Sequence, residues 1–159
     1  PLRLNKLEGD AALLYAVATL GEADVAREVA RQVGALFKTF KAKTQARVQT
    51  LRFRALLHVG QAAFNKLRQF EEIAGVDVIL IHRLLKNSVS LPEYALMTER
   101  FYRLAGGLEA GTTEARVEAV EGFGEVPVWV RCVEFVPALA LMTWDGTRSW
   151  MKLRGSMRP

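Results

Sequence analysis

The sequence predicts one small α+β domain, an α/β sandwich with a central, mainly antiparallel sheet and helices packed on it. Several short segments alternate apolar and polar residues, as half-buried strands do, and longer segments repeat apolar residues at helical spacing. The chain has 159 residues, of which 50% are hydrophobic, and this suffices for one buried core. We therefore expect a single domain.

The first elements are predicted to be a β-hairpin and a long helix. Residues 2–7 and 11–15 are apolar segments on either side of Glu8-Gly9-Asp10, a turn-forming sequence. A helix is expected from Glu22 to about Thr44, because apolar residues recur there at helical spacing. These residues are Val25, Val29, Val33, Leu36, Phe37 and Phe40.

The middle of the chain is predicted to hold a second hairpin and a second helix. Residues 51–59 alternate and then become wholly apolar, like a strand that passes into a covered sheet. Gly60 ends this strand, and residues 61–67 are expected to return as its partner. After Gly75 the apolar residues again follow helical spacing until Lys86-Asn87-Ser88.

A strand, a short helix and a last hairpin are predicted for the remaining part. Residues 94–97 form the strand, and Thr98 is expected to cap a helix that ends at Gly106-Gly107. Two alternating stretches, 114–120 and 126–135, lie on either side of a glycine-containing turn and predict the hairpin.

The domain is predicted to span residues 1–136, followed by a C-terminal tail of residues 137–159 that folds back on the domain or on a second copy. No apolar run approaches the ~20 residues of a membrane span. The one cysteine, Cys132, fits a strand packing position and a reducing compartment. We therefore expect a cytoplasmic protein without a membrane span.

The charge is uneven along the chain, with a net value of +5. Basic residues gather in residues 38–54 and acidic residues in 114–125. A solvated helix face is the favoured explanation, and attraction to a nucleotide, an acidic partner or an anionic surface is the alternative. A basic surface-binding or nucleic-acid-binding protein is accordingly a third functional interpretation, and it rests on charge alone.

Several motifs resemble those of the class III nucleotide cyclase homology domain. Lys6 to Ala11 resembles the Lys-x-x-Gly-Asp-Ala segment of adenylyl and guanylyl cyclases, and Arg54 to Gly60 resembles their Arg-(apolar)-Gly-Ile-His-x-Gly strand. Met97 to Leu104 is similar to their Val-Thr-x-x-(aromatic)-x-x-Leu helix, and Glu121 to Glu125 stands at their Lys-Gly-x-Gly hairpin. The resemblance covers residues 1–136 and implies a ferredoxin-like cyclase fold and a homodimer.

A closer likeness is to a group of uncharacterised bacterial cyclase-like proteins. They carry Leu-Glu-Gly-Asp-Ala and His-Arg-Leu-Leu-Lys-Asn-Ser-Val, which are similar to Leu7 to Ala11 and His82 to Val89 here. This likeness adds no function of its own.

The resemblance implies four site residues. Asp10 aligns with one of two aspartates that bind Mg²⁺ or Mn²⁺ together with a purine nucleotide. Lys6 and Glu72 align with the pair that selects the base, and Arg83 aligns with the arginine that stabilises the developing phosphate charge. Three of them also have a structural interpretation, in which Lys6 ends a strand, Glu72 is a solvated carboxylate, and Arg83 is a helix-surface residue that pairs with Glu72 or Asp77.

Other positions depart from the cyclase pattern. Ile79 stands where an asparagine orients the ribose, and Glu121 and Phe123 stand where lysines bind phosphate. The second aspartate precedes the hairpin in the family, ahead of the first residue here. Because losing one donor costs about 10²–10³ in rate, we predict a degenerate, non-catalytic cyclase-like domain that serves as a signalling or regulatory binding module. An active, metal-dependent adenylate or guanylate cyclase is the alternative.

His58 and His82 are interpreted as core-edge residues.

Overall fold

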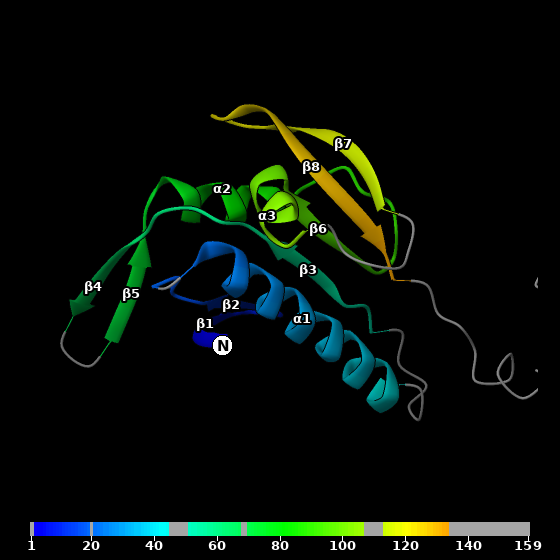
Figure 1. The fold of residues 1–159 in the computed structure, drawn as a ribbon, viewed down its shortest axis with the longest axis horizontal. Coiled ribbons are helices and arrows are strands. Elements are labelled where there is room, and N and C mark those ends of the chain that lie inside the picture. The colour runs from blue at the N-terminus through cyan, green and yellow to red at the C-terminus, as the bar shows by residue number, and fades with distance from the viewer. Residues whose placement is uncertain (1, 20, 45–50, 68–69, 107–112, 134–159) are drawn as a thin grey trace, which may run out of the picture.

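The computed structural model describes residues 2–19, 21–44, 51–67, 70–106 and 113–133 (Figure 1). Three helices are interspersed among the strands of the described residues, and the predicted α+β class is confirmed. The elements are β1 (Arg3–Glu8), β2 (Ala11–Tyr15), α1 (Glu22–Thr44), β3 (Arg54–Leu57), β4 (Ala63–Leu67), β5 (Phe70–Ala74), α2 (Val76–Leu84), β6 (Tyr94–Thr98), α3 (Glu99–Leu104), β7 (Thr113–Val120) and β8 (Gly124–Cys132).

A four-stranded sheet with the order β3-β6-β8-β7 forms the centre of the fold. β3 and β6 run parallel, whereas β6–β8 and β7–β8 are antiparallel. The predicted last hairpin is confirmed as β7–β8, in which Val120 pairs with Gly124 at the turn. The sheet is therefore mainly antiparallel, as the sequence predicts.

The central strand β6 contributes side chains to two separate cores. All five of its residues are buried, and successive side chains point to opposite faces of a sheet. Ala95 and Met97 pack in one core with α1 and α3. Tyr94 and Leu96 pack in the other core with α2. The helices α1 and α2 thus cover opposite faces of the sheet.

The pairing predicted for the second hairpin is wrong. β4 pairs with β5 in a separate two-stranded sheet, and β3 pairs with β6. Loop closure explains the local pairing, because β4 reaches β5 through a much shorter connection than a distant strand would need. The apolar β3 instead takes a parallel neighbour after the crossover through α2. The β4–β5 hairpin projects to the left of the sheet in Figure 1.

The remaining elements follow the prediction closely. The β1–β2 hairpin is confirmed, with Glu8 paired to Ala11 across the turn, and α1 has the predicted bounds. Thr98 stands at the N-cap of α3, but its side chain makes no capping hydrogen bond there. Gly106 follows the helix with a φ of 79°, a conformation that favours glycine.

Some predictions fall outside the described residues. The tail 137–159, the end of the last predicted strand and Gly107 belong to this group. Among the helices that the structure describes, none has both the length and the apolar character needed to cross a bilayer.

Candidate functional site

The candidate site is a cluster of charged side chains from β1 and α2, with β5 beside them. Lys6 Nζ lies 2.6 Å from Glu8 Oε1, and His82 Nδ1 lies 3.5 Å from Glu8 Oε2. The hydrogen bond with Glu8 raises the pKa of Lys6, and the negative charge of Glu72 contributes to this shift. Lys6 and Glu72 stand on β1 and β5, two strands that are in contact.

The two hairpins hold these residues together. The rings of Tyr15 on β2 and Phe64 on β4 are in contact, with centroids 5.3 Å apart. Glu72 lies on β5, in register with Asn65 on β4. The hydrogen bond from Lys6, and then the charges of Lys6 and His82, lower the pKa of Glu8. Glu8 is thus a carboxylate held between two groups that carry or can acquire positive charge.

Asp10 lies in the turn between β1 and β2, where its side chain is exposed. Within the described ranges, no group of three or more His, Cys, Asp or Glu side chains is arranged to hold a metal ion. A divalent cation at Asp10 therefore needs further ligands from a nucleotide, from water or from residues beyond those described.

Arg83 projects from α2 to the turn of the β7–β8 hairpin. Its Nη1 donates a hydrogen bond to the Glu121 carbonyl oxygen and lies 3.6 Å from Glu121 Oε2. The structural interpretation named Glu72 or Asp77 as its ion-pair partner, and this is wrong: the recorded partner is Glu121. This contact joins α2 to the turn between β7 and β8.

Ile79 lies one helical turn before Arg83 on α2 and is 51% exposed. Its side chain cannot donate or accept a hydrogen bond. Nearby elements also expose apolar side chains, namely Leu4 and Leu7 on β1 and Val76 on α2. The surface around the charged cluster is therefore mixed, with exposed apolar side chains beside the charged ones.

A second cluster, which sequence reasoning missed, joins residues from three elements. His58 Nδ1 lies 3.0 Å from Thr98 Oγ1, and His58 Nε2 lies 3.1 Å from Asp77 Oδ1. Asp77 Oδ2 accepts a hydrogen bond of 2.7 Å from the Gln61 backbone N–H. The cluster connects the end of β3, the first turn of α2 and the end of β6.

The atom types of this second cluster match those of a hydroxyl–imidazole–carboxylate triad, but its burial does not suit nucleophilic catalysis. Thr98 is only 5% exposed, so its hydroxyl cannot reach a substrate in solution. We interpret His58 as a positioning residue that fixes α2 relative to the sheet. A signal was present in the sequence, since all three side chains stand at the ends of predicted elements.

Acid should weaken this second cluster. The pKa of Asp77 is lowered, chiefly by the hydrogen bond from Gln61 and then by His58. Because the pKa of Asp77 is lower in the folded state than its unfolded value of about 3.9, its ionisation stabilises the fold at pH values above 3.9. This contribution to the free energy of unfolding is lost as the pH falls through the folded-state pKa. We expect urea unfolding at pH 5 and at pH 3 to show that the wild type loses more stability between these two pH values than Asp77→Asn does.

The matched control for this experiment is Asp10→Asn, which removes an exposed carboxylate in a turn. This variant should lose as much stability between pH 5 and pH 3 as the wild type does. If Asp77→Asn loses as much stability as the wild type between the two pH values, Asp77 does not have the proposed role.

Comparison with known proteins places the chain in a family. Residues 1–94 match a family described as "Protein of unknown function (DUF2652)". The chain belongs to this family. The matched DUF2652 region contains the charged cluster around Glu8, together with Asp10 and Arg83. It also contains His58 and Asp77 of the second cluster, but not Thr98.

A relative of this DUF2652 chain is an uncharacterised protein of Mycobacterium tuberculosis (strain ATCC 25618 / H37Rv). The two are 35% identical over 109 residues, which are 62% of this chain and 50% of the relative. The chain thus spans about half the length of that relative. No solved structure matches the chain. The resemblance to class III cyclases remains a hypothesis about this DUF2652 chain.

Proposed function

We propose that this domain is a non-catalytic, cyclase-like signalling or regulatory module that binds a purine nucleotide at the cluster of Lys6, Glu8, Glu72 and His82. The observation that carries the proposal is the contact between β1 and β5, which places Lys6 and Glu72 on neighbouring strands of two different hairpins. A purine edge presents acceptors together with an amine or amide donor, so a cation and a carboxylate side by side complement it. In this account Glu8 orients Lys6.

Three features of the site argue against efficient catalysis. Arg83 is engaged with Glu121, whose carboxylate repels a triphosphate. Ile79 offers no hydrogen bond to a ribose, and Asp10 has no companion metal ligands in the ranges that the structure describes. Since groups in such a site act as a unit, these defects together leave little rate enhancement.

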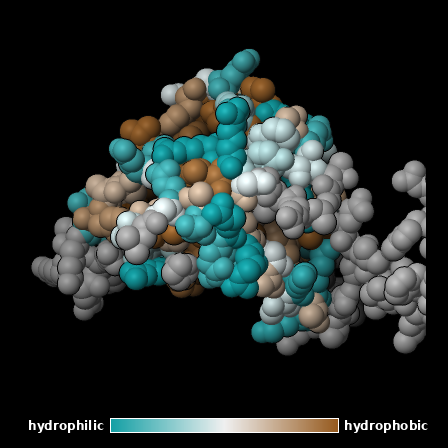
Figure 2. Space-filling model, viewed as in Figure 1, coloured by the Kyte–Doolittle hydropathy of each residue, from teal (hydrophilic) through white to brown (hydrophobic). Residues whose placement is uncertain are grey.

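A homodimer is part of the proposal. Leu7 is 70% exposed and Val76 is 68% exposed, on elements that also carry the charged cluster. Figure 2 shows patches of hydrophobic surface between hydrophilic side chains on one face of the molecule. Exposed apolar side chains near a candidate site favour burial against a partner, and a second copy of the chain is the partner we propose.

The charge of α1 gives little support to a basic binding surface. Arg27 pairs with Asp24, Arg31 pairs with Glu28 and Lys41 lies 3.5 Å from Glu93. Because carboxylates compensate these cations, we favour a solvated helix face over a nucleic-acid surface.

Removal of Lys6 should weaken nucleotide binding. We expect Lys6→Ala to raise the Kd for ATP or GTP about tenfold, because one charge-assisted hydrogen bond to the base contributes about 1.5–3 kcal/mol. Glu72→Gln keeps the size but removes the charge, and it should change the preference between the two nucleotides. Isothermal titration calorimetry with Mn²⁺ present measures both effects.

The control for these variants is Lys43→Ala, which removes an exposed lysine near the end of α1. It lowers the net charge by the same amount and should leave the affinity unchanged. Equal losses for Lys6→Ala and Lys43→Ala would point to general charge attraction and would refute the proposed site.

A further inference from the structure

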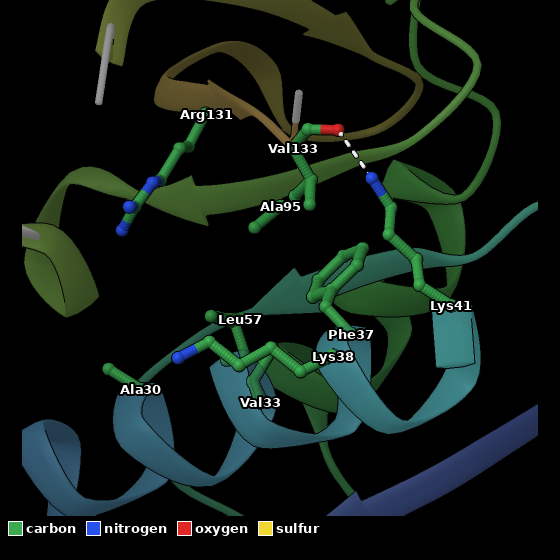
Figure 3. Close-up of a pocket in the computed structure, with 10 residues that line it drawn as sticks. Ala30, Val33, Phe37, Lys38, Lys41, Leu57, Ala95, Arg131 and Val133 are labelled. Atoms are coloured by element: carbon green, nitrogen blue, oxygen red, sulfur yellow. Dashed lines mark hydrogen bonds between the residues drawn. The ribbon is translucent and has the colours of Figure 1, made fainter. Parts of the chain in front are cut away.

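A cavity of about 260 Å³ lies between α1 and the face of the sheet opposite α2 (Figure 3). Val33 and Phe37 from α1 form one wall, and Leu57 on β3 and Ala95 on β6 form the other. All four belong to the α1-side core. Because a core cavity of about 150 Å³ already accommodates a benzene ring, this one has room for at least one branched aliphatic side chain.

The chain leaves β8 at the edge of this cavity. The Val133 side chain lines the cavity and packs against the α1-side core. The Val133 N–H donates a hydrogen bond of 3.4 Å to the Glu93 carbonyl oxygen. The Val133 carbonyl oxygen accepts a hydrogen bond of 3.3 Å from Lys41 Nζ, which is the dashed line in Figure 3. The residue with which the described part of the chain ends is thus held at the cavity.

Lys41 takes part in this arrangement as a compensated cation. Besides its hydrogen bond to Val133, its Nζ lies 3.5 Å from Glu93 Oε2. The apolar walls of the cavity, and not charge, therefore determine which group it accepts. An apolar side chain that enters it replaces water on apolar surface.

The sequence after Val133 supplies such side chains. Residues 138–142, which lie outside the residues that the structure describes, read Ala-Leu-Ala-Leu-Met. Leu139 follows Val133 by six residues, and a segment of this length extends to at most about 20 Å. The part of α1 that lines the cavity, from Ala30 to Lys41, is about 16 Å long. Leu139 can therefore reach the cavity from the point where β8 ends.

We propose that residues 138–142 of the same chain dock in this cavity as an extended strap, with Leu139 and Leu141 inside it. Successive side chains of an extended segment point to opposite sides, so the two leucines project to one side and the alanine between them to the other. Pro137 favours an extended approach, because a proline disfavours helical geometry in the residue that precedes it. The strap thus completes the α1-side core.

This inference is independent of the proposed nucleotide site. His82 and Ile79 lie on α2, which covers the other face of the sheet. A failure of one proposal therefore leaves the other untouched.

The test is disulfide cross-linking within the full chain, in which Cys132→Ser removes the native cysteine. Gly34→Cys places a thiol at the cavity, where a Cβ would meet nothing within 4 Å, and Leu139→Cys places the second thiol on the strap. Under mild oxidation we expect this pair to form an intramolecular disulfide, which mass spectrometry detects as the loss of both free thiols in the monomer.

The matched control is the pair of Leu36→Cys and Leu139→Cys. Leu36 is 43% exposed and stands two residues after Gly34 on α1, so it points about 200° away around the helix. A segment that is not docked would reach both positions at comparable rates. A docked strap should cross-link to Gly34→Cys roughly tenfold faster, because a disulfide forms only where the two Cα atoms come within about 7 Å.

A charge on the strap separates docking from mere proximity along the chain. Leu141→Asp keeps the length of the chain but places a carboxylate against apolar walls, so it should slow the cross-link between Gly34→Cys and Leu139→Cys about tenfold. Without the cysteine substitutions, Leu141→Asp should also lower the midpoint of urea unfolding. Leu153→Asp makes the same exchange beyond the strap and should change neither quantity.

The proposal is overturned if the two cysteine pairs cross-link at the same rate in variants that circular dichroism shows to be folded. It is equally overturned if Leu141→Asp and Leu153→Asp have the same effect. Disulfide-linked dimers in place of the intramolecular product would also contradict it, because the occupant of the cavity would then come from a second copy of the chain.

Discussion

Gly60→Ala should destabilise the protein by about 2–3 kcal/mol. A Cβ at this position would lie 2.3 Å from Asp77 Cγ and 2.6 Å from Asp77 Cβ. The second contact involves the root of the side chain, so rotation of the carboxylate alone cannot relieve it, and the first turn of α2 must move. The hydrogen bonds of Asp77 with His58 and Gln61 are then lost together.

The matched control is Gly34→Ala, in the interior of α1. The added Cβ meets nothing within 4 Å, and alanine favours a helix by about 1 kcal/mol over glycine. Urea unfolding should therefore show a higher midpoint for Gly34→Ala and a much lower one for Gly60→Ala. A Gly60→Ala variant as stable as the wild type would contradict the close packing of Asp77 against Gly60.

Leu96→Ala should cost about 3 kcal/mol of stability. Leu96 is 0% exposed on β6, and it packs in the α2-side core with Leu84, Val128 and Val130. Removing its side chain leaves a cavity between α2 and the sheet that a rigid central strand cannot close. Chemical denaturation monitored by circular dichroism gives this value.

The control for Leu96→Ala is Leu7→Ala. Leu7 is 70% exposed, so its truncation should change the stability of the monomer by no more than about 0.5 kcal/mol. Equal losses in the two variants would contradict the assignment of Leu96 to a core and of Leu7 to the surface.

The local elements could be predicted from sequence because their signals are local. The helical spacing in residues 22–44 gave α1 its bounds, and the turns at Gly9 and Gly122 marked two hairpins that the structure confirms. Pairing between distant strands has no such signal. β3 was assigned a neighbour in sequence, whereas its partner β6 follows only after β4, β5 and α2.

Hydropathy also fails to predict which side chains of β7 are buried. Val117 is exposed and Glu118 is only 3% exposed, the reverse of what their side chains suggest. Glu118 accepts hydrogen bonds from the backbone N–H and the hydroxyl of Ser88, at 2.8 and 2.9 Å. A buried carboxylate needs such partners, and sequence alone does not show that the loop after α2 supplies them.

The site was only partly predictable. Lys6 and Glu72 were paired through the family resemblance, and the structure places them on β1 and β5, two strands that are in contact. The contacts of Arg83 with Glu121, and of His58 with Asp77 and Thr98, join residues that are far apart in sequence. His58, Asp77 and Thr98 stand at the ends of predicted elements, but no periodicity or motif in the chain specifies these pairings.

The most direct test of the proposed function is calorimetric titration of the chain with ATP and with GTP in the presence of Mn²⁺, combined with an assay for cyclic product in the same samples. We predict saturable binding of a purine nucleotide without detectable cyclic product. Absence of binding by either nucleotide would contradict the nucleotide site, and formation of cyclic product would contradict the non-catalytic role.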